Sequence, residues 1–171
     1  QVLSDYYKTA GLITDNKPVS SQNLEIFKQQ KRQNLYEAVN FYRKGLTALN
    51  FPKNYDIDFV NENREWISLF SCIELLKLIA DNYSELANLD QSKDVTTLNE
   101  PMLMAIKTYG LLGSLIQQAR KEISDDESKI QLTAIENSTF HQIINISYTA
   151  YSLTHENKYL ELAFENSERI K

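Results

Sequence analysis

The stretch TTLNEPMLMAIKTYGLLGSLIQQARKEI, residues 96 to 123, contains the signals that decide the fold class. Asn99 can accept a hydrogen bond from a helix N-terminus, and Pro101 falls in the first turn, where its missing N–H is not needed. Apolar side chains then recur every three or four positions, as they do on one face of a helix. The members of this stripe are Met102, Ala105, Ile106, Tyr109, Leu112, Ile116, Ala119 and Ile123. The stretch therefore predicts an amphipathic helix with a defined start.

The same helical period recurs in four other segments, which predicts helices through residues 35–49, 66–87, 128–154 and 159–171. Their predicted apolar stripes are, in order, Leu35, Ala38, Val39, Tyr42, Leu46 and Leu49; Trp66, Leu69, Cys72, Ile73, Leu76, Ile79, Ala80, Tyr83, Leu86 and Ala87; Phe140, Ile143, Ile144, Ser147, Tyr148 and Tyr151; and Leu160, Ala163, Phe164, Ser167 and Ile170. Asn50-Phe51-Pro52 is expected to end the first of these helices, because proline disfavours helical geometry in the residue before it. The 171 residues include only four glycines and three prolines. Sheet proteins need many turns, so this scarcity favours long helices and short loops. We predict an all-α fold, with helices adjacent in sequence packed antiparallel, as a single domain over residues 1–171.

Internal similarity suggests how these helices are organised. The segments DYYKTAGLI and NFYRKGLTAL align Tyr7 with Tyr42, 35 residues apart, which is close to the ~34-residue period of a tetratricopeptide (TPR) repeat. Ala38, Tyr42 and Gly45 have the small–aromatic–small spacing of a second TPR helix, and Tyr109 lies 67 residues after Tyr42, about two periods on. The spacing predicts a TPR-like array of antiparallel helix pairs, an α-α superhelix with irregular repeats. An irregular helical bundle, in which alanine and tyrosine recur by chance, is the alternative.

Four motifs follow one another in order over residues 98–171. They are Leu115-Ile116 with Ala119-Arg120; an acidic turn with Asp125, Asp126, Glu127 and Lys129; Ala150, Tyr151, Leu153 and Thr154; and Tyr159, Leu160, Glu161, Ala163, Phe164, Glu168 and Lys171. In this order and spacing the C-terminal half resembles the TPR-type region that precedes the caspase-like domain of CHAT-family proteins.

The resemblance implies a non-catalytic arm that binds a protein or peptide partner and regulates a downstream domain of the same chain. In the family that domain carries a His/Cys dyad, and neither His141 nor Cys72 matches a dyad position. Because the chain begins at Gln1 without a methionine, we expect a piece of a longer multidomain protein, with a cytoplasmic location as the first expectation and export as the alternative.

Charge and hydropathy exclude several classes of function. The net charge is −5 and the lysines and arginines are scattered, so no basic face of the kind that nucleic acid requires is predicted, nor a membrane contact. No apolar run approaches the roughly 18 residues of a membrane span.

Residues that could carry chemistry are few. Cys72 lies among apolar positions and is expected to be a buried thiol. His141 and His155 are 14 residues apart, some 20 Å along a helix, which is too far to share a metal. The acidic residues near Asp126 favour a helix start by complementing the helix dipole. No phosphate loop, calcium loop or nucleophile motif is recognisable, so we expect no enzymatic activity, cofactor or metal.

The ten tyrosines are the most unusual feature of the composition. On helices they suit packing with one polar tip, or a groove that binds an extended peptide. Tyr109, Asn145 and Tyr148 are the candidates for contacting a partner in such a groove. Two other functions stay open at this point: the sensor half of a signalling kinase or transcription regulator, and a stand-alone helical bundle that binds a ligand.

Overall fold

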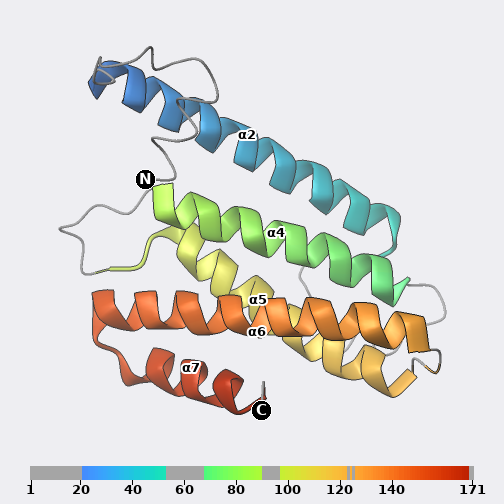
Figure 1. The fold of residues 1–171 in the computed structure, drawn as a ribbon. Coiled ribbons are helices and arrows are strands. Elements are labelled where there is room, and N and C mark those ends of the chain that lie inside the picture. Colours follow the sequence, from blue (N-terminus) through green and yellow to red (C-terminus); the bar gives the residue numbers. More distant parts are fainter. Residues whose placement is uncertain (1–20, 53–67, 90–96, 123, 125, 170–171) are drawn as a thin grey trace, which may run out of the picture. The chain divides into compact units, whose positions relative to one another are not determined.

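The computed structural model describes residues 21–52, 68–89, 97–122, 124 and 126–169 (Figure 1). Its helices are α2 (Ser21–Ala48), α4 (Leu69–Leu89), α5 (Glu100–Glu122), α6 (Asp126–Thr154) and α7 (Asn157–Arg169). Every regular element in the described part of the chain is a helix, which confirms the all-α prediction. Tyr7, Trp66, Ile123 and Ile170, which the predicted repeat and stripes include, lie outside the described residues.

The chain divides into two compact units, Gln1–Asn34 and Leu35–Lys171. Of the first unit, the structure describes the N-terminal half of α2, residues 21–34. The second unit contains the rest of α2 together with α4 to α7, and the description below concerns this unit alone. The single domain predicted over residues 1–171 stays a prediction.

Within the second unit, the chain reverses direction at each connection from α4 to α7 (Figure 1). The extensive helix contacts are those of α4 with α5, α5 with α6, and α6 with α7. Each of these helices therefore packs chiefly on its neighbours in sequence and antiparallel to them, as the short connections predicted.

Asn99 controls the reversal between α4 and α5. Its Oδ1 accepts a hydrogen bond from the Met102 N–H at 2.9 Å, which is the N-cap that the sequence predicted. Its Nδ2 donates to the Ala87 carbonyl at 3.1 Å, in the last turn of α4. One side chain therefore satisfies a free N–H of one helix and a free carbonyl of the previous one, which fixes the return of the chain.

The end of α2 lies where it was predicted, but the decisive residue is Asn50, not Pro52. Asn50 adopts a left-handed backbone with φ of 61°. Its N–H donates to the Thr47 carbonyl at 3.1 Å, and the Phe51 N–H donates to the Leu46 carbonyl at 2.9 Å. This pair of bonds is the Schellman motif, in which a left-handed residue turns the chain back onto the last helical turn. Leu46 and Phe51 are both buried in the core, and Pro52 follows a helix that has already ended.

The apolar stripes predicted for α4 and α5 form most of the core. The buried side chains on these two helices include Cys72, Ile73, Leu76, Ile79, Ala80, Tyr83, Leu86, Ala87, Met102, Ala105, Tyr109, Leu112, Leu115, Ile116 and Ala119. The spacing of apolar residues in the sequence was sufficient to predict most of these buried positions, because each of the two helices has one broad apolar face to bury.

The predicted stripe of α7 was correct at Ala163, which is buried, and wrong at Leu160 and Phe164. Leu160 and Phe164 were expected to face the core, but Phe164 is 65% exposed and Leu160 is also exposed. The buried residues of α7 are Tyr159, Ala163 and Asn166. Asn166 can be buried because its Nδ2 donates to the Leu162 carbonyl at 2.7 Å, which satisfies the amide within its own helix.

Gly45 is a point of close approach between α2 and α4. A Cβ added at Gly45 would lie 3.0 Å from Leu75 Cδ1, which is tighter than ordinary van der Waals contact. Gly110 on α5 has nothing within 4 Å of the corresponding position.

The two glycines give a matched test of that close approach. Alanine in a helix interior is favoured over glycine by about 1 kcal/mol. Gly110→Ala is expected to raise the free energy of unfolding by roughly this amount, whereas Gly45→Ala is expected to gain less or to lose stability, because Leu75 must move. Urea unfolding of both variants measures the difference; an equal gain at both positions would show that Gly45 is not held against Leu75.

Candidate functional site

Cys72 is fully buried in the core. Burial raises the pKa of its thiol to about 11, because desolvation disfavours the thiolate. The thiolate is the reactive form of cysteine, so this side chain is suited to packing and not to nucleophilic chemistry.

The two histidines lie apart, one within α6 and the other just after its C-terminal end. His141 is exposed within the helix, and His155 occupies a left-handed position (φ of 56°) just after it. The His155 N–H donates to the Tyr151 carbonyl at 2.8 Å, which closes the helix end. No group of three or more His, Cys, Asp or Glu side chains within the described residues could hold a metal ion. None of the described helices is long and apolar enough to cross a membrane.

Tyr109, one of the three partner-groove candidates, is a core residue. It is only 1% exposed, and its hydroxyl donates to Asp81 Oδ1 at 2.7 Å. Lys77 Nζ donates to the other oxygen of Asp81 at 2.6 Å. Burial and the neighbouring carboxylate both raise the pKa of Tyr109 above its usual range. This side chain joins α5 to α4 and is not in position to contact a partner in this conformation.

The other two candidates, Asn145 and Tyr148, are exposed on α6. The structure therefore does not bring the three candidate residues to one surface. Tyr148 was also placed on the apolar side of its helix by the sequence pattern, and that placement was wrong, because more than half of the residue is exposed.

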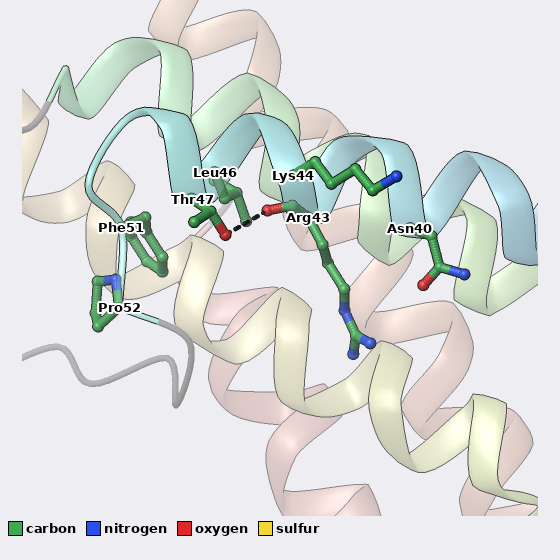
Figure 2. Close-up of a pocket in the computed structure, with 7 residues that line it drawn as sticks. All are labelled: Asn40, Arg43, Lys44, Leu46, Thr47, Phe51 and Pro52. Atoms are coloured by element: carbon green, nitrogen blue, oxygen red, sulfur yellow. Dashed lines mark hydrogen bonds between the residues drawn. The ribbon is translucent and has the colours of Figure 1, made fainter.

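One hollow of ≈ 540 Å³ lies at the C-terminal end of α2 (Figure 2). Its lining residues are Asn40, Arg43, Lys44, Leu46, Thr47, Phe51 and Pro52. The Arg43 guanidinium lies 5.7 Å from the centre of the Tyr83 ring on α4, a cation–π contact. Figure 2 shows the Lys44 ammonium pointing away from Phe51 and Pro52. The two cationic side chains of this hollow therefore do not point toward its apolar part at Phe51 and Pro52: Arg43 contacts Tyr83, and Lys44 points away.

A second hollow, which we call the α4–α6 groove, has a volume of ≈ 560 Å³ and is lined by side chains of two helices. Ser71, Glu74, Leu75, Lys77 and Leu78 come from α4, and Ile135 comes from α6. Leu78 is 41% exposed, so part of its side chain is open to solvent at the groove. These leucines lie outside the core stripe of α4, so sequence reasoning missed them; a second apolar flank at Leu75 and Leu78 is the signal that could have found them.

Phe41 on α2 is an exposed aromatic residue outside the lining of the α4–α6 groove. It is 72% exposed, and it lies about one helical turn before Gly45, the residue whose position adjoins Leu75.

The chain matches no protein-family model, no curated protein and no solved structure.

The role of Tyr109 in joining the helices is tested by Tyr109→Phe. Removing the hydroxyl leaves one oxygen of Asp81 without its donor and is expected to lower the free energy of unfolding by about 1 to 2 kcal/mol. Tyr148→Phe removes the same atom from an exposed side chain and serves as the control, with no measurable change expected. Equal unfolding midpoints for both variants and the unmodified chain would contradict a structural role for the Tyr109 hydroxyl.

Burial of Cys72 predicts a slow reaction with thiol reagents. In the native chain at about pH 8, a chromogenic disulfide reagent is expected to react with Cys72 only as fast as the chain unfolds, and to react at once in denaturant. Rapid stoichiometric labelling of the folded chain would mean that the thiol is exposed and ionised, against the structure.

Proposed function

We propose that this chain is a non-catalytic protein-interaction module, a TPR-like helical arm whose α4–α6 groove receives the partner. The observation that supports this most strongly is the groove itself. In an antiparallel series, α4 and α6 are alternate members, so they can contribute to one face while α5 packs between them. Leu75, Leu78 and Ile135 make that face apolar, and exposed apolar surface with a polar rim is typical of protein-binding sites.

The TPR-like part of the proposal is supported by packing between sequence neighbours. In solenoid arrays each repeat contacts chiefly the repeats beside it, and α4 to α7 follow this pattern. Gly45 also permits the close approach of two helices that the TPR spacing requires. The helices α4, α5 and α6 contain 21, 23 and 29 residues, more than a period of ~34 residues allows for two helices and their turns. The proposed repeats are therefore irregular.

We also propose, from the resemblance of residues 98–171, that the arm regulates a CHAT protease-like domain of the same polypeptide. A partner in the groove would favour one packing of the helices over another, and so change how the arm acts on its neighbour. The coding sequence downstream of codon 171 tests this directly. A caspase-like domain with a His/Cys dyad is expected; a kinase or DNA-binding domain there would contradict the CHAT assignment and favour a sensor arm of another signalling protein.

The interaction itself is tested by site-specific photo-crosslinking in the cells that make the protein. A benzophenone amino acid is placed at Leu78 in the α4–α6 groove or, as the control, at Leu103 on α5, a leucine of similar exposure (49%) outside that lining. An adduct of defined mass with another protein is expected from position 78 and not from position 103. Equal yields at both positions, or none at either, would contradict a partner-binding groove.

A further inference from the structure

We propose that the α4–α6 groove binds a basic amphipathic helix of a partner protein. The inference rests on the proposed function and specifies its ligand. A groove between two helices suits a third helix, which lays its apolar face along the groove and inserts side chains spaced three or four residues apart. Leu75 and Leu78 have this spacing on α4, and Ile135 faces them from α6.

The charges around the groove select for a basic partner. Glu74 belongs to the lining and is exposed. Lys77 is the one cation among the lining residues described, and it already forms an ion pair with Asp81 at 2.6 Å. The lining therefore presents a carboxylate available for a partner's lysine or arginine, while its own ammonium is neutralised.

A second exposed carboxylate belongs to the first turn of α6, outside the groove lining, where Lys129 of the same helix pairs with Asp126. Glu127 is exposed on α6, about two helical turns before Ile135. The two helices run in the same direction (Figure 1), so their N-terminal halves, with Glu74 and Glu127, lie toward the same side. The whole chain carries a net charge of −5, which also favours the approach of a basic helix over an acidic one.

The test uses the 171-residue chain and two labelled peptides of about 18 residues, long enough to form a helix. One peptide has a leucine face and a lysine face, and the control peptide replaces every lysine with glutamate. Fluorescence anisotropy measures the affinity. The lysine peptide is expected to bind at least about tenfold more tightly than the glutamate peptide.

Two matched pairs of variants locate the binding. Leu78→Ser is expected to weaken binding of the lysine peptide by about tenfold, because a buried leucine contact is lost, whereas Leu103→Ser leaves it unchanged. Glu74→Lys and Glu161→Lys change the net charge equally, and Glu161 is exposed on α7. Glu74→Lys is expected to weaken binding more than Glu161→Lys does, with the difference shrinking in about 1 M salt. Circular dichroism melts confirm that each variant is folded.

Several results would overturn the inference. One is an equal loss of lysine-peptide affinity in the two leucine variants, or in the two glutamate variants. Another is equal affinity of the unmodified chain for both peptides. A third is a dimer of the chain in sedimentation that Leu78→Ser dissociates, which would make a second copy the occupant of the groove. Absence of peptide binding together with a crosslink at position 78 would overturn the basic-helix inference and leave the interaction function standing. Absence of both would overturn the two together.

Discussion

In the second unit, the helices α4 to α7 make their extensive contacts with neighbours in sequence, α4 with α5, α5 with α6 and α6 with α7. Other features of the unit can be understood from this constraint. A helix that packs on both neighbours needs a tight reversal at each end. The reversals are built from local hydrogen bonds: Asn99 serves α4 and α5 together, and Asn50 and His155 end their helices in the left-handed conformation. A further consequence is that alternate helices can share a face, which is where α4 and α6 form their groove.

Polar interactions between the helices fix which faces meet. Tyr109 on α5 bonds to Asp81 on α4, and Arg120 near the end of α5 forms an ion pair with the buried Glu136 of α6 at 2.9 Å. A buried carboxylate without a partner would be costly, so Glu136 restricts how α5 and α6 can slide or rotate against each other. Arg120 belongs to one of the motifs through which the sequence resembles the CHAT-associated region, and the ion pair gives that position a structural role.

Much of the fold could be predicted from the sequence where one apolar stripe dominates a helix. The stripes of α4 and α5 and the cap at Asn99 are of this kind, because period and capping chemistry are local properties. The stripe of α7 was not predictable in the same way. That helix has two short apolar flanks, and burial of Tyr159 and Asn166 in place of Leu160 and Phe164 depends on the neighbouring helix and on the bond that satisfies the Asn166 amide.

The candidate site was harder to predict than the fold. Tyr109 was proposed for a binding groove because tyrosines suit such surfaces, but the ring fits equally well between two helices, and only the packing distinguishes the two environments. The groove-lining leucines of α4 were missed because they lie beside the core stripe. A residue in that position is either simply half-buried or lines a surface groove, and which of the two occurs depends on side chains from α6, a helix distant in sequence. Here the side chain from α6 is Ile135.

The most direct measurement of whether α4 and α6 share one face is a methyl–methyl NOE spectrum of the deuterated chain with labelled leucine and isoleucine methyl groups. Cross-peaks between Ile135 and the methyl groups of Leu75 or Leu78 are expected, because the three side chains line one groove. If Ile135 instead shows cross-peaks to methyl groups of α5 and α7 and none to those of α4, the two helices do not form a common face, and the structural basis for the proposed interaction is contradicted.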